Sequence, residues 1–237
     1  MKEDRKVAFV GSGPGDPEMM TLRAVREIEE CDVLFFDSSI KSEVLDMAGS
    51  DILKIGVGEP GGHFNPVEVA EIMARYAESG KKVVRLKIGD PSIFCKTDIE
   101  IKILKDHGIG YYIVPGISSA FASAASAGII LTESKVSSTV CLASGMDSKN
   151  GRKVDWKKLA SCADTIIVYL GSQDAEKYTR DLISGGMDPE MPAVIVCGST
   201  LKDQKIIRTN VSGIPESMQR GGGYACTLII GKVTSVS

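Results

Sequence analysis

The segment Val83–Phe94 reads VVRLKIGDPSIF, and it decides the fold. Val83, Val84 and Leu86 form a short apolar run, which Gly89-Asp90-Pro91 ends abruptly. Glycine adopts backbone conformations that other residues resist, whereas proline fixes φ and removes an N–H donor. The pattern therefore predicts a buried strand followed by a tight turn. Ligands of open α/β sheets bind at the carboxyl ends of strands, so this turn is either a ligand site or an ordinary strand end.

Apolar strands and amphipathic helices alternate on both sides of this segment. The first helix carries Leu22, Val25 and Ile28 at the spacing of one helical face. Strands that alternate with helices are typical of a parallel sheet with helices on both faces. The predicted strands are Lys6–Val10, Val33–Phe36, Ile52–Ile55 and Tyr111–Val114, and the predicted helices are Thr21–Glu30, Ser42–Ala48, Pro66–Ser79 and Asp98–His107.

The sequence changes in character after Pro115-Gly116. Ser118–Ala127 is a predicted helix made almost entirely of small residues, which allow close approach of another backbone or a ligand. Further strands are predicted at Ser137–Ala143, Thr165–Tyr169, Ala193–Cys197, Lys205–Thr209 and Cys226–Ile230, and helices at Trp156–Ala160, Asp174–Ile183 and Pro215–Arg220. The last strands have little helix between them, which favours a mixed sheet. We therefore expect two α/β domains, residues 1–116 with a parallel sheet and 117–237 with a mixed one.

The composition is that of a soluble globular protein. Of the 237 residues, 43% are hydrophobic and 25% are charged. The net charge of -3 gives no support to nucleic-acid binding, which normally shows a basic excess. No apolar run reaches the ~18 residues of a membrane span, and the N-terminus MKEDRKVAFVG has no signal-peptide pattern. We expect a cytoplasmic protein with no membrane partner.

The sequence has few cysteine and histidine residues in patterns that could bind a metal ion. None of the six cysteines forms a C-x-x-C pair, and buried free thiols are favoured over disulfides or metal ligands. The only histidines are His63 and His107. His107 stands at a predicted helix end, where a cationic ring is favourable, whereas His63 lies in a Gly-rich loop and is more open to a functional role. We expect no metal site.

Several predicted strands end in polar loops that should lie at one edge of the first sheet. These loops are Gly11–Pro17, Asp37–Ser39, Lys87–Ile93 and Gly116–Ser119. The first of them, GSGPGDP, lacks the third glycine of G-x-G-x-x-G, and Asp16 would repel a pyrophosphate. A dinucleotide is therefore disfavoured. Converging Gly, Ser and Asp groups suit a polar, uncharged or cationic ligand, although plain turns use the same residues.

Three ordered segments resemble a known family, the tetrapyrrole (corrin/porphyrin) methylases. They are VGSGPGDPEMMTLRAVREIEECDVLFFD from Val10, VVRLKIGDPSIF from Val83 and VPGISSAFASAASAGIILT from Val114. The similarity continues through VYLGS at Val168–Ser172 and MPAVIVCGST at Met191–Thr200, and thus covers nearly the whole chain. Within the family, the chain is most similar to the uroporphyrinogen-III C-methyltransferases.

The resemblance implies two α/β domains, a homodimer, and S-adenosylmethionine (SAM) in the cleft between the domains, with S-adenosylhomocysteine as product. It implies methylation of uroporphyrinogen III at C2 and C7 to give precorrin-2. Because the sulfonium methyl is already activated, catalysis consists of positioning plus a base for the departing proton. Asp37 matches the family's proposed proton acceptor. SAM contacts would come from Pro14, Ile88, Gly89, Asp90, Ile93, Ser118, Ser119, Leu170 and Gly198.

Some positions depart from the family pattern and keep alternatives open. Ile88 replaces a glycine, Cys95-Lys96-Thr97-Asp98 replaces a basic Gly-rich tail, and Glu59 stands where a lysine is common. The letters SIF before that tail are closer to the methylases of precorrin-4. A cobalt-precorrin-4 C11-methyltransferase is therefore one alternative, and a non-catalytic SAM- or tetrapyrrole-binding protein is another. Asp37 itself is either a proton acceptor or a helix N-cap together with Ser38 and Ser39.

Overall fold

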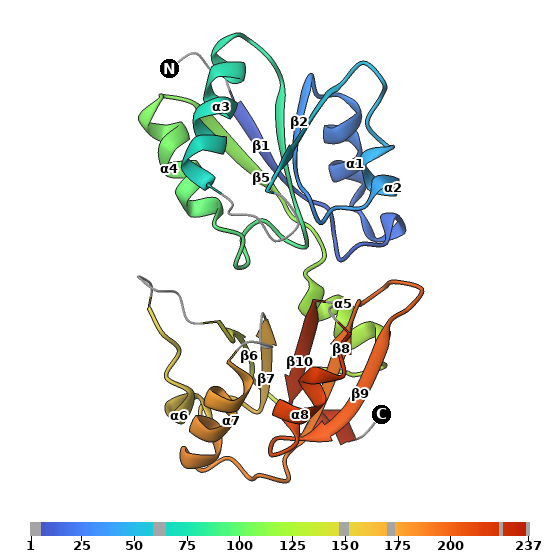
Figure 1. Ribbon diagram of the computed structural model, residues 1–237, viewed down its shortest axis with the longest axis vertical. Coiled ribbons are helices and arrows are strands. Elements are labelled where there is room, and N and C mark those ends of the chain that lie inside the picture. The colour runs from blue at the N-terminus through green and yellow to red at the C-terminus, as the bar shows by residue number, and fades with distance from the viewer. Residues whose placement is uncertain (1–5, 59–64, 147–151, 170–173, 223–224, 236–237) are drawn as a thin grey trace. The chain divides into compact units, whose positions relative to one another are not determined.

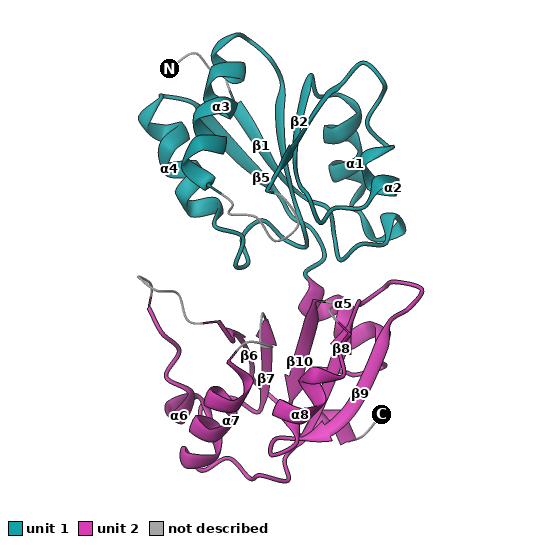
Figure 2. Ribbon diagram, in the orientation of Figure 1, with its two compact units in different colours: residues 1–118 teal, residues 119–237 magenta. Residues whose placement is uncertain are grey.

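Two compact units, residues 1–118 and 119–237, make up the chain (Figure 2). The structure is a computed structural model that describes residues 6–58, 65–146, 152–169, 174–222 and 225–235. Each unit has its own five-stranded sheet and its own hydrophobic core. The expected α/β class with two sheets is confirmed.

Five parallel strands form the sheet of the first unit, in the order β3-β2-β4-β1-β5. Their bounds are β1 Lys6–Gly11, β2 Val33–Asp37, β3 Leu53–Val57, β4 Val83–Lys87 and β5 Gly110–Val114. The helices are η1 Pro17–Met19, α1 Leu22–Glu29, α2 Ser42–Leu45, α3 Pro66–Glu78 and α4 Thr97–Asp106. Helices α1 and α2 pack on one face of the sheet and α3 and α4 on the other, as expected for strands buried on both sides (Figure 1).

Local signals in the sequence explain where these helices begin. The Thr21 hydroxyl accepts from the backbone N–H of Ala24 and caps α1, while Ile28 on the same helix is buried against the sheet. The side chain of Asn65 accepts from the backbone N–H groups of Val67 and Glu68, ahead of a proline at the first position of α3. Both caps satisfy N–H groups that a helix start leaves without partners.

The second unit has a mixed sheet in the order β6-β7-β10-β8-β9. Only β6 and β7 pair in parallel, and the remaining neighbours are antiparallel. The strands are β6 Val140–Ser144, β7 Thr165–Tyr169, β8 Pro192–Cys197, β9 Lys205–Asn210 and β10 Cys226–Ile230. The helices are α5 Ser119–Ser126, α6 Trp156–Leu159, α7 Ala175–Ser184, α8 Ile214–Gln219 and η2 Lys232–Ser235. Helices α6, α7 and α8 cover one face, and α5 with η2 the other.

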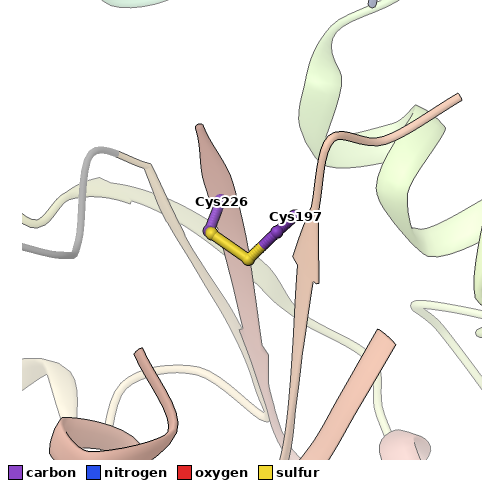
Figure 3. Close-up of a disulfide and its surroundings, with 2 residues drawn as sticks. All are labelled: Cys197 and Cys226. Carbon is purple, nitrogen blue, oxygen red and sulfur yellow. A yellow bond between two sulfur atoms is a disulfide. The ribbon is translucent and has the colours of Figure 1, made fainter. Parts of the chain in front are cut away.

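A disulfide joins Cys197 of β8 to Cys226 of β10 (Figure 3). The expectation of free thiols is therefore wrong for this pair. The two residues stand directly opposite each other in the antiparallel register, with Cα atoms 4.0 Å apart. This proximity is a property of strand pairing across 29 positions of sequence, so spacing alone does not reveal it. Cys31, Cys95, Cys141 and Cys162 are free, and within the described ranges no helix is long and apolar enough to cross a bilayer.

Candidate functional site

Three glycines bring the loops after β1, β4 and β5 into contact at the carboxyl edge of the first sheet. A Cβ atom added to Gly116 would lie 2.2 Å from the carbonyl oxygen of Gly89, and one added to Gly11 would lie 2.5 Å from the same oxygen. Gly13 and Gly89 exchange backbone hydrogen bonds of 2.8 and 3.3 Å. Gly89 also has a φ of 67°, a conformation that favours glycine. Side chains are excluded here because backbones touch.

Asp90 ties the turn after β4 to the segment after β5. One carboxylate oxygen accepts from the backbone N–H of Gly116 at 3.1 Å, and the other accepts from Ser92 through its N–H and its hydroxyl. These bonds link the turn after β4 to the segment after β5. Of the neighbouring positions with an expected SAM contact, Ile88 is 40% exposed, and Ile93 and Pro14 are partly exposed.

Asp37 is the last residue of β2, and its side chain is 26% exposed. Its Oδ1 atom lies 2.5 Å from Nη2 of the wholly buried Arg85 on β4. The alternative interpretation of Asp37 as a helix N-cap is wrong, because α2 begins at Ser42 and its N-cap position is Lys41. The carboxylate is thus an ion-pair partner at the edge of the sheet rather than a capping group.

A cluster of buried charges surrounds this pair. We name it the charge cluster, and it consists of Asp37, Arg85, Lys87 and Glu100. The Glu100 carboxylate lies 3.2 Å from Arg85 Nε and 2.8 Å from Lys87 Nζ, and all three side chains are almost completely buried. Burial lowers the pKa of Lys87, and the charge of Arg85 lowers it further, whereas Glu100 acts in the opposite direction. The four charges sum to zero.

Sequence reasoning missed Arg85, Lys87 and Glu100. A signal was present, because Arg85 and Lys87 alternate with apolar residues inside a strand whose two faces are both buried. Cations at such positions are rare unless they are paired. The spacing of 2 places both on the face covered by α4, which carries Glu100.

The loop between β4 and α4 is strained and firmly held. Phe94 and Lys96 both have positive φ, 52° and 54°, which is uncommon for residues other than glycine. Lys87 Nζ donates to the carbonyl of Cys95 at 3.1 Å, and the hydroxyl of Thr97 donates to the carbonyl of Pro91 at 2.6 Å. Burial raises the pKa of the Cys95 thiol to about 11, so this cysteine is an inert thiol at neutral pH. The surrounding contacts thus fix a backbone that would otherwise relax.

Other expected site residues lie elsewhere in the chain. Ser118 is buried just after Gly116, and Ser119 begins α5. Gly198 follows β8 with a φ of 62°, and the hydroxyl oxygens of Ser199 and Thr200 beside it are buried with no hydrogen-bond partner in the described part of the chain. The expected SAM contact at Leu170 falls outside the described residues, as do Glu59 and His63.

Two surface cavities in the described part of the chain lie away from these loops. One, of about 470 Å³, lies between α7 and the start of α8. The other, of about 370 Å³, lies near the amino ends of β1 and β4. Across the residues that the structure describes, no group of three or more His, Cys, Asp or Glu side chains could hold a metal ion.

Several curated proteins are similar to this chain over nearly its whole length. The siroheme synthase of Methylococcus capsulatus is 38% identical over 228 residues, which is 94% of this chain and 48% of that protein. The siroheme synthase of Psychromonas ingrahamii is 35% identical over 236 residues, 98% of this chain and 49% of that protein. The chain therefore spans about half the length of these relatives.

Solved structures match this chain over nearly the full length of both chains. A cobalt-precorrin-4 methyltransferase has a TM-score of 0.87 at 27% identity, with 98% of this chain and 96% of that one covered. A uroporphyrin-III C-methyltransferase from Thermus thermophilus, complexed with S-adenosylhomocysteine, has a TM-score of 0.82 at 28% identity, with 98% and 94% covered. Residues 6–215 match the family described as Tetrapyrrole (Corrin/Porphyrin) Methylases. The chain belongs to the tetrapyrrole (corrin/porphyrin) methylase family.

Proposed function

We propose that this protein is a SAM-dependent C-methyltransferase that converts uroporphyrinogen III to precorrin-2 by methylating C2 and C7. The observation that carries the proposal is the match of 98% of the chain to a uroporphyrin-III C-methyltransferase bound to S-adenosylhomocysteine. The similarity to siroheme synthases over 94–98% of the chain supports the same substrate class. Siroheme and cobalamin synthesis are the pathways to which this reaction belongs.

The proposed methyl donor fits what the described residues offer. SAM supplies a methyl group already activated by its sulfonium charge. Gly89 itself has no side chain to obstruct a ligand, and its φ of 67° is one that favours glycine. The proposed contacts are Pro14, Ile88, Gly89, Asp90, Ile93, Ser118, Ser119, Leu170 and Gly198.

Asp37 is proposed as the acceptor of the proton that the macrocycle loses after methyl transfer. A base must reach its substrate, and the 26% exposure of this side chain leaves the carboxylate accessible. The ion pair with Arg85 keeps the carboxylate in one orientation at the end of β2. An oriented base of this kind needs no metal ion or covalent intermediate for its own part of the reaction.

The proposal is tested with methyl-labelled SAM and uroporphyrinogen III under anaerobic conditions. Label in the macrocycle together with the precorrin-2 spectrum is the expected result. Asp37→Asn should lower kcat by a factor on the order of 100 while the Kd for SAM, measured by calorimetry, stays the same. Neighbouring Ser38→Ala is the matched control and should keep its kcat. Unchanged turnover in Asp37→Asn would contradict the assignment of the base.

A second candidate substrate is cobalt-precorrin-4, methylated at C11. The backbone of this chain is more similar to that of a cobalt-precorrin-4 methyltransferase, with a TM-score of 0.87, than to that of the uroporphyrin-III enzyme, with 0.82. This difference favours the second candidate substrate. The same assay run with cobalt-precorrin-4 separates the two. Tight SAM binding without transfer to either tetrapyrrole would instead support a non-catalytic binding protein.

The assembly and the compartment are proposed from the family alone. We propose a homodimer in the cytoplasm, with a tetrapyrrole as the only partner besides SAM. Light scattering of the purified protein should give twice the mass of the chain. A monomeric mass at micromolar concentration would refute the dimer.

A further inference from the structure

The buried carboxylate of Glu100 connects α4 to two cations of β4. Its Oε1 atom lies 3.2 Å from Arg85 Nε, and its Oε2 atom lies 2.8 Å from Lys87 Nζ. Glu100 has no exposed surface, and it lies in the first turn of α4. Removing these three charges from water costs free energy that their mutual attraction only partly returns. An apolar cluster of similar volume would serve stability as well, so the cluster calls for a role beyond packing.

Arg85 contacts both Glu100 and Asp37 and thereby links the two carboxylates. Its guanidinium donates from three sides: Nε to Glu100, Nη1 to the carbonyl of Leu86 at 3.0 Å, and Nη2 to Asp37. A guanidinium is planar and rigid, so contacts on three sides fix its orientation. Asp37 is the only member of the charge cluster with substantial exposure, and its carboxylate is therefore held from the buried side by Arg85 and free to meet a ligand on the other.

We propose that Glu100 is a positioning residue for methyl transfer: acting through Arg85, it fixes the Asp37 carboxylate at the edge of the first sheet. This inference rests on the proposed function, because it takes Asp37 as the proton acceptor. The reaction slows when the base is displaced, even if every reacting group is present. A misplacement of about 1 Å can lower the rate on the order of 100-fold. Glu100 touches neither the methyl donor nor the tetrapyrrole in this role.

The central variant is the double substitution Glu100→Met with Lys87→Met. It removes one anion and one cation, so the rest of the charge cluster remains neutral, and unbranched methionines fill the space. A single Glu100→Met change would leave buried positive charge in excess and risks misfolding. Asp98→Asn is the matched control, because Asp98 is an exposed acid in the same turn of α4.

The expected result is a loss of kcat in a folded protein. The double variant should still unfold cooperatively and still bind SAM, while kcat falls by about 100-fold. In an Asp37→Asn background the same double substitution should cause no further loss, because its effect passes through Asp37. An equal loss with and without Asp37 would overturn the proposal, since it would show that the cluster serves the structure of the loop instead.

A measurement that needs no turnover separates this inference from the proposed function. The Nε–H signal of Arg85 in nitrogen-15 NMR, assigned by its loss in Arg85→Lys, should shift in both Asp37→Asn and the double variant. An Nε–H chemical shift that stays the same in either variant would refute the coupling of Glu100 to Asp37 through Arg85. A wild-type protein that methylates neither tetrapyrrole would refute the proposed function, and the NMR result would still decide whether Glu100 holds Arg85 against Asp37.

Discussion

The contact among Gly11, Gly89 and Gly116 makes Gly116→Ala a sharp test of the loop arrangement. The added methyl would lie 2.2 Å from the Gly89 carbonyl oxygen and 2.8 Å from Gly11 Cα, both inside van der Waals contact. Gly116 does not have a positive φ, so alanine suits its backbone and the clash is the whole effect. Relief requires that the turn after β4 move away by about 1 Å, at a cost of about 1–3 kcal/mol for overpacking.

That movement also strains the hydrogen bond from Gly116 N–H to Asp90, which is 3.1 Å long. A hydrogen bond to a charged group contributes about 1.5–3 kcal/mol, so the combined loss is about 2.5–6 kcal/mol. For a chain of this size each kcal/mol lowers Tm by about 2–4 °C, which gives a decrease of roughly 5–24 °C. If SAM binds at the Gly89 turn as proposed, its Kd should rise as well.

Thermal unfolding by circular dichroism and SAM titration by calorimetry measure both effects. Gly49→Ala is the matched control in the same unit, because Gly49 has no positive φ and its nearest neighbouring atom is 4.0 Å from the added methyl. Its Tm should stay within about 2 °C of the wild type. A Gly116→Ala protein with the same Tm as this control would refute the reasoning, since the three loops would then not be in contact.

Two further predictions concern the disulfide and a histidine. Cys226→Ser should lower the free energy of unfolding by about 3 kcal/mol, because the bond to Cys197 closes a loop of 29 positions; dithiothreitol should lower the Tm of the wild type and leave that of the variant unchanged. A wild-type Tm that is unchanged by dithiothreitol would contradict the disulfide between Cys197 and Cys226. His107 has a raised pKa, chiefly through its hydrogen bond with Glu78 and also through Glu71. The pairing stabilises the fold below the ordinary pKa of histidine and is lost as the pH rises through the raised value. The advantage of wild type over His107→Gln in urea unfolding should therefore shrink as the pH rises above that ordinary pKa. A difference independent of pH would count against the ion pair.

Sequence reasoning succeeded where the signal is local. The strand predicted from Val83 is β4, and the Gly-Asp-Pro turn ends it as expected. The helix start at Pro66 is confirmed by the Asn65 cap. These features depend on neighbouring residues alone, through backbone preference, hydrophobic periodicity and capping groups. The roles of the expected SAM contacts and of Asp37 stay predictions.

The remaining features depend on pairing between distant positions. The N-cap alternative for Asp37 failed because α2 begins at Ser42, and the partner that the carboxylate has instead is Arg85, 48 residues away. The free-thiol prediction failed for Cys197 and Cys226 because only the register of β8 and β10 sets them opposite each other. No sequence spacing encodes which strands become neighbours in a sheet.

The sequence by itself determined the family, the two-sheet α/β class and the β-strand with its turn at Val83–Phe94. The tertiary structure alone decided that three glycine backbones meet at the sheet edge and that Glu100 and Arg85 stand behind Asp37. The physical reason is the separation in sequence over which each interaction acts. Periodicity and turn chemistry act within a few residues, whereas close backbone contact and ion pairing act across a fold that brings distant residues together.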